Sequence, residues 1–225
     1  MNELGRRIEI GQTLSAASET LSKHPVTFLT MTLMSGVFLA IADAYLGPTI
    51  TAAGNIAAMI VGVIATLRAL QIRCGSDIAM NANIGRAFGA SLLKTIAILI
   101  GFVFLIVPGV LLLMRWALVL PALILEDLRI REAMERSANL SKGSRWQILG
   151  LSLIVSVPVV VIAVLMGVLF GALVGNGADR SLFLKVSLNL LGTLPMVLNA
   201  IVFVESYLTL SGQRDRPGAM ADIFA

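Results

Sequence analysis

The sequence predicts an all-α membrane protein, a polytopic transmembrane helical bundle with six spans arranged as three helical hairpins and interfacial elbow helices. Of its 225 residues, 57% are hydrophobic and only 13% are charged, whereas a soluble domain is about one quarter charged. Several apolar stretches reach the roughly 20 residues that cross about 30 Å of hydrocarbon. We therefore expect residues 1–225 to form a single integral membrane domain.

The first hairpin is expected to consist of spans 26–46 and 50–70. Gly47 and Pro48 lie between them, and this residue pair ends a helix and allows a tight turn. The preceding segment, 8–22, has apolar residues at helical spacing on an otherwise polar background. It therefore predicts an interfacial helix that leads into the first span.

The second hairpin must come from the apolar stretch 92–125, which would be about 50 Å long as one helix and exceeds a single crossing. Pro108 and Gly109 lie near its middle and predict a hairpin turn between spans 92–107 and 109–125. One long kinked helix is the alternative. The arginine-rich flanks favour the hairpin, because both flanks are then cytoplasmic. Interfacial helices are expected at 82–91 and 128–142.

The third hairpin is expected to comprise spans 146–174 and 186–208. Arg214 and Arg216 follow the last span and mark a cytoplasmic C-terminus. Since six crossings return the chain to its starting side, both the N- and the C-terminus are expected in the cytoplasm.

The three interfacial segments can be aligned as an internal repeat. Its positions are Ile10, Ile84 and Ile130, then Leu14, Phe88 and Met134 four residues on, then Ala17, Ser91 and Ser137 seven residues on. Within each segment, the three positions fall on one helical face. Three unrelated amphipathic helices would also align in this way, so the repeat stays one of two interpretations.

Small residues recur every fourth position on two expected spans. They are Gly54, Ala58 and Gly62 on the second span, and Gly167, Gly171 and Gly175 on the fifth. Such stripes allow close helix packing, either within this chain or with a second copy or another membrane protein. Pro158 and Pro195 interrupt the last two spans. Paired broken helices can mark a transport site, although prolines also kink ordinary membrane helices.

Arg115 is the most informative single residue, since it falls inside the expected span 109–125. A charge there requires a partner or contact with water. Asp43 and Asn189 are expected at a similar depth and are the candidate partners in an intramembrane polar site. The arginine either braces the bundle or contacts a ligand or lipid phosphate.

No residue set for chemistry is recognisable. The chain has one histidine, His24, and one cysteine, Cys74, so no His or Cys cluster can complete a metal site or a nucleophile–base pair. We therefore expect no catalytic, metal or cofactor-binding residues and no cofactor. The basic loops lack the interleaved aromatic residues of a nucleic-acid surface, and no nucleic-acid partner is expected.

Several short motifs resemble a bacterial family, the glycerophosphoryl diester phosphodiesterase membrane domain. They are Ile10-Gly11, Val107-Pro108-Gly109, Arg115-Trp116, and the run Pro121 to Trp146 with Leu125-Glu126, Arg136-Ser137 and Lys142-Gly143. In that family the phosphodiesterase chemistry belongs to a separate soluble barrel, for which this chain is too short and lacks the motifs. The resemblance therefore implies a six-span membrane module without an enzyme activity of its own, in a bacterial cytoplasmic (inner) membrane.

The sequence leaves two functions open. The first is a non-catalytic module that associates with membrane lipids or with membrane partner proteins, including a second copy. The second is a small transporter or lipid-handling permease that uses the proline-broken helices and Arg115. A membrane-embedded lipid enzyme is a third, disfavoured by the missing residue sets.

Overall fold

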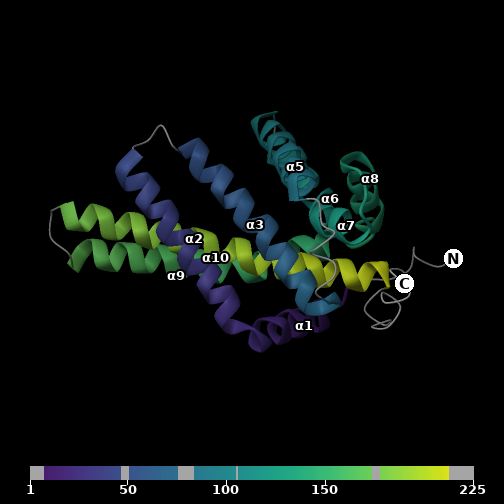
Figure 1. Ribbon diagram of the computed structural model, residues 1–225, viewed down its shortest axis with the longest axis horizontal. Helices are drawn as coiled ribbons and strands as arrows, with labels where there is room; N and C mark the ends of the chain where they lie inside the picture. The colour runs from purple at the N-terminus through teal and green to yellow at the C-terminus, as the bar shows by residue number, and fades with distance from the viewer. Residues whose placement is uncertain (1–7, 47–50, 76–83, 105, 174–177, 213–225) are drawn as a thin grey trace.

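The computed structural model describes residues 8–46, 51–75, 84–104, 106–173 and 178–212. Within these ranges the chain is all-α and contains no strand (Figure 1). The helices are α1 (Ile10–Lys23), α2 (Pro25–Leu46), α3 (Thr51–Cys74), α5 (Ile84–Phe104), α6 (Ile106–Arg115), α7 (Val119–Leu125), α8 (Ile130–Leu140), α9 (Arg145–Leu173) and α10 (Ala178–Ser211).

Two of the three expected elbow helices are separate helices in the structure. α1 ends at His24, because the residue before a proline disfavours the helical conformation and Pro25 begins α2. α8 is followed by Gly143, whose φ of +89° ends the helix before α9 begins. The expected separate elbow 82–91 is wrong, since α5 continues from Ile84 to Phe104 without a break.

The three aligned isoleucines of the proposed repeat are each the first residue of a helix, namely α1, α5 and α8. Three residues further along, Thr13, Ala87 and Ala133 are all buried, with 0 to 1% exposure. The three helices therefore share a small buried residue at the same aligned position, which favours the interpretation as a repeat.

The expected turn at Pro108 and Gly109 is wrong in position. Both residues lie in the first turn of α6, where proline is tolerated because the N–H groups there have no helical partner. The chain reverses between α5 and α6 instead. A Cβ atom on Gly101 of α5 would lie 3.1 Å from the Cα of Gly109, which is possible only for two helices running back along each other.

The expected span 109–125 is divided in the structure. α6 ends at Arg115, a turn follows, and α7 begins at Val119. α7 is buried by neighbouring helices along nearly its whole length. Its burial shows that this part of the chain belongs to the protein interior.

α10 is the central helix of the molecule. It packs against α2, α9, α3 and α1 (Figure 1). Around its C-terminal half, two apolar clusters meet. One contains Phe28, Leu70 and Ile201, and the other contains Ile8, Leu118 and Tyr207.

Two helical segments of the described residues are long and apolar enough to cross a membrane, Arg145–Met166 and Gly192–Ser211. Only 12% of the most apolar stretch of the first is buried within the protein. Its exposed side chains include Val160, Val161 and Val164. A soluble core helix of this composition would be covered, so the exposed apolar surface indicates a lipid-facing helix.

One of the small residues predicted to pack helices can be assessed directly. Gly62 of α3 is buried, and a Cβ atom there would lie 2.6 Å from the Met196 methyl carbon of α10. Gly62 therefore allows close packing within this chain. Gly54 and Ala58 on α3, and Gly167 and Gly171 on α9, lie outside the described side chains, and Gly175 lies outside the described residues.

Candidate functional site

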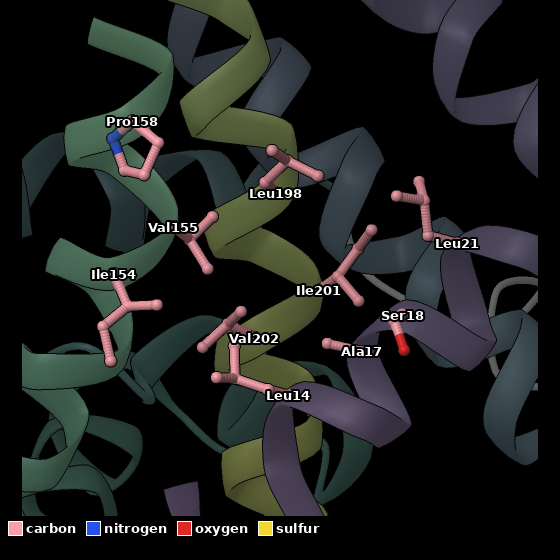
Figure 2. Close-up of a pocket in the computed structure, with 10 residues that line it drawn as sticks. All are labelled: Leu14, Ala17, Ser18, Leu21, Ile154, Val155, Pro158, Leu198, Ile201 and Val202. Carbon is pink, nitrogen blue, oxygen red and sulfur yellow. The ribbon is translucent and has the colours of Figure 1, made fainter. Parts of the chain in front are cut away.

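An apolar groove runs between α1 and the hairpin formed by α9 and α10. α1 supplies one wall through Leu14, Ala17, Ser18 and Leu21, which share one helical face (Figure 2). α1 is amphipathic, so the opposite face carries exposed polar residues such as Gln12 and Ser15. The sequence pattern that predicted an interfacial helix thus also builds a groove wall.

The facing wall comes from Ile154, Val155 and Pro158 of α9 and from Leu198, Ile201 and Val202 of α10 (Figure 2). The cavity volume is about 340 Å³, near the lower end of the roughly 300–1,000 Å³ typical of small-molecule sites. Ser18 is the only lining residue with a polar side chain. The groove therefore suits a hydrocarbon chain and offers no charged group.

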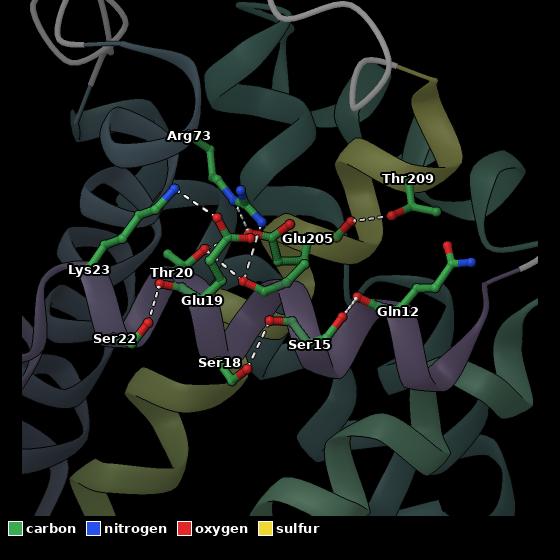
Figure 3. Close-up of polar contacts among 11 residues, drawn as sticks. Gln12, Ser15, Ser18, Glu19, Thr20, Ser22, Lys23, Arg73, Glu205 and Thr209 are labelled. Atoms are coloured by element: carbon green, nitrogen blue, oxygen red, sulfur yellow. Dashed lines mark hydrogen bonds and ion pairs between the residues drawn. The ribbon is translucent and has the colours of Figure 1, made fainter.

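A polar cluster holds α1 to the bundle on a neighbouring face. Arg73, near the end of α3, forms an ion pair with Glu205 of α10, and the Thr20 hydroxyl of α1 donates to the same carboxylate oxygen over 2.8 Å. Arg73 Nη2 also donates to the Ala16 carbonyl of α1 over 3.3 Å. Figure 3 shows these contacts joining three helices that are distant in the sequence.

The cluster neutralises its own charges. Glu205 is 1% exposed and its charge is matched by Arg73. On the exposed side of α1, Lys23 pairs with Glu19 at 2.7 Å (Figure 3). Among the described residues, Glu205 Oε2 accepts no hydrogen bond although it is buried. The Arg73–Glu205 pair thus holds helices together, and one oxygen of the Glu205 carboxylate has no hydrogen-bond donor among the described residues.

A second carboxylate, which is half-buried, connects α7, α8 and α10. Glu126 Oε1 accepts a hydrogen bond from the Tyr207 hydroxyl and lies 3.1 Å from Arg136 Nε. Tyr207 is fully buried. The hydroxyl and the guanidinium thereby satisfy the carboxylate where α7 ends.

Arg115 lies at the boundary between α6 and the turn that follows it. It is the last residue of α6 and its side chain is exposed, while its backbone carbonyl accepts a hydrogen bond from Ser137 of α8 over 2.9 Å. Asp43 lies in α2, outside the described side chains, and Asn189 is half-buried in α10. A polar site of Arg115 with Asp43 or Asn189 therefore stays a prediction.

Sequence reasoning missed the importance of the carboxylates near the helix ends. It singled out none of Glu126, Asp127 and Glu205 as a site residue, yet Glu205 is buried and Glu126 is bonded to a buried tyrosine. Asp127 is exposed but pairs with Arg86 of α5 at 2.8 Å. One available signal was the position of Glu205, which directly follows the apolar run Ala200 to Val204.

No group of three or more histidine, cysteine, aspartate or glutamate side chains gathers in the described part of the chain. Cys74 lies beyond the expected span 50–70, next to Arg73. Burial raises the pKa of its thiol to about 11, and the charge of Glu205 adds to this effect.

Residues 88–212 match the family model described as the membrane domain of glycerophosphoryl diester phosphodiesterase. The match covers more than half of the chain. The chain belongs to this family. The matched region includes α6 to α10 and thus the α9–α10 wall of the groove together with Glu126 and Glu205. The sequence-based resemblance is therefore confirmed, and the protein is a membrane domain of this family. Comparisons with curated proteins and with solved structures gave no match.

Proposed function

We propose that this protein is a non-catalytic membrane module that associates with lipids by holding an acyl chain in the groove between α1 and α9–α10. The observation that carries this proposal is the lining of the groove, which is apolar on both walls except for Ser18. An acyl chain from the bilayer is held in such a groove by van der Waals packing against the walls and needs no charged partner.

The position of the groove supports the same function. Its outer wall is an amphipathic helix of the kind that lies at the headgroup layer. Its inner wall is continuous with the exposed apolar surface of α9. A lipid chain can therefore enter sideways from the bilayer.

A matched pair of serines on α1 provides the test. Ser18 lines the groove and Ser22 does not; both are exposed, and each donates a hydrogen bond to the backbone carbonyl three residues earlier. We expect Ser18→Trp to lower photo-crosslinking of a diazirine acyl lipid to the groove several-fold, because the indole occupies the space. Ser22→Trp should behave as the unmodified protein. Crosslinks read by peptide mass spectrometry that spread evenly along α9, with no groove enrichment, would contradict the proposal.

A lipid-handling permease is the second function, and the position of Pro158 on the groove wall favours it. Proline removes one backbone hydrogen bond and allows α9 to bend beside the bound chain. Reconstituted protein would then speed the transbilayer movement of a labelled lipid, whereas a binding module would leave it at the rate of empty vesicles.

For the membrane arrangement we propose six crossings in a bacterial inner membrane, with both ends in the cytoplasm. The arginine-rich segments flanking the middle hairpin support this arrangement. Association with a second copy or another membrane protein through the small-residue stripes is part of the same proposal, for the stripe residues not already packed within the chain.

A further inference from the structure

We propose that α1 is a movable strap over the groove, held closed by Arg73, Glu205 and Thr20, and that this clamp controls the entry of the acyl chain. The inference rests on the proposed function of the groove and adds its regulation. The same helix both walls the groove and is tied to the bundle by the clamp.

α1 is fixed at its two ends. Ile8, just before the helix, is 2% exposed and packs in the cluster around Tyr207. At the other end, His24 has non-helical backbone angles and Pro25 begins α2. A bend at these two points moves the middle of α1 without unfolding either neighbour.

The apolar side chains in the middle of α1 are attached only in part, since Leu14, Ala17 and Leu21 are half-buried where they pack against the two core clusters. The residues that α1 buries are Thr13, Ala16 and Thr20, all small or hydroxyl-bearing. The apolar side chains Leu14 and Leu21 are only half-buried and face the groove. Among the fully buried residues of α1, Ala16 and Thr20 are hydrogen-bonded to α3 and α10, and these contacts form the clamp.

The clamp also contains an uncompensated group. Glu205 Oε2 is buried without a hydrogen-bond donor among the described residues. Lifting α1 would give this oxygen access to water, which offsets part of the cost of opening. A bound chain that contacts α1 in only one of the two positions would shift the balance between them.

Thr20→Val tests the strap and leaves both residues of the Arg73–Glu205 pair in place. The substitution keeps the shape of the side chain and removes only the hydroxyl, which lies 2.8 Å from Glu205 Oε1 and 3.0 Å from the Ala16 carbonyl oxygen of its own helix. Thr13→Val is the matched control, since Thr13 is equally buried in α1 and its hydroxyl donates only to the Glu9 carbonyl of the same segment. Cys74, which packs against the same core as Ala17 and Leu21, reports on lifting of the helix.

Protein in lipid nanodiscs would be treated with a water-soluble maleimide, and exchange of a fluorescent acyl lipid would be followed in parallel. We expect Thr20→Val to raise both the labelling rate of Cys74 and the lipid exchange rate about fivefold, the equivalent of one hydrogen bond. Thr13→Val should leave both rates unchanged. Equal rates for Thr20→Val and the unmodified protein would overturn the strap. Absence of lipid exchange in all three proteins, with faster labelling of Thr20→Val alone, would instead reject the groove as a lipid site and leave the movement of α1 standing.

Discussion

The single cysteine of the chain lies beside the ion pair that joins α3 to α10. Its thiol has a pKa of about 11 instead of an ordinary 9.0, first because it is buried and second because Glu205 is near. The thiolate is the reactive form, so a raised pKa slows alkylation at every pH below it. We expect Cys74 to react about tenfold more slowly than in the unfolded chain at pH 8, after allowance for the greater nucleophilicity of a more basic thiol.

The measurement is a maleimide time course from pH 7 to 11, with detergent-unfolded protein as the control. The rate in the folded protein should still be rising at pH 10, where the unfolded control has levelled off. A folded protein that levels off near pH 9 would show that the thiol is neither buried nor close to Glu205.

The burial of charged side chains near helix ends was the least predictable part of the site. Glu205 and Asp127 both lie near a helix end in the sequence, but one is buried in an ion pair and the other is 76% exposed. The difference depends on whether another helix crosses at that point. α1 crosses α10 at Glu205, and no local pattern in the sequence encodes that crossing.

At the scale of elements, the close contact between α5 and α6 predicts that an added methyl group at Gly101 lowers the stability of the protein. Gly101 faces the backbone of Gly109, where a Cβ atom would lie 3.1 Å from Cα and 2.9 Å from the Leu112 methyl carbon. Backbone cannot move aside as a side chain can, so we expect Gly101→Ala to destabilise the protein by about 1–3 kcal/mol. The midpoint of thermal unfolding in detergent measures the effect.

Gly150→Ala is the control, because Gly150 lies in α9 and an added Cβ atom there would meet nothing within 4 Å. Alanine is the better helix former, so this variant should be unchanged or more stable by up to about 1 kcal/mol. If both variants unfolded at the same temperature, α5 and α6 would not be in close contact at Gly101.

The helical elements themselves were largely predictable, and their junctions were not. Expected ranges such as 26–46 agree closely with helices such as α2, because long apolar runs fix where a helix can form. The turn was predicted at Pro108 because proline ends a helix when it falls in the helix interior, but proline is also favoured in the first turn of a helix. Only the position of Gly101 against Gly109 distinguishes the two, and that is a tertiary contact.

For the whole molecule, the central position of α10 explains why this helix carries Glu205 of one polar cluster, Tyr207 of the other and part of one groove wall. It contacts α1, α2, α3 and α9 and is also joined to α7 through Tyr207. Composition predicted a membrane bundle, but the choice of central helix depends on how its crossings pack. The charges of the loops predict on which side of the membrane each end of a helix lies. They do not predict which helix is central.

The depth of the middle hairpin in the membrane follows from its helix lengths, which also define the test. α5 has 21 residues and is about 31 Å long, enough to cross the hydrocarbon. α6 has 10 residues, about 15 Å, so the return must be completed by the segment through α7. Two single-cysteine variants in a Cys74→Ala background test this arrangement. Phe104→Cys places a thiol at the end of α5, and Glu135→Cys places one on the exposed face of α8. With six crossings, a membrane-impermeant maleimide should label the Phe104→Cys thiol only from the outer side and the Glu135→Cys thiol only from the cytoplasmic side. A Phe104→Cys thiol protected from both sides, with Glu135→Cys still labelled from the cytoplasm, would mean that α5 and α6 turn back inside the membrane and that four helices cross it.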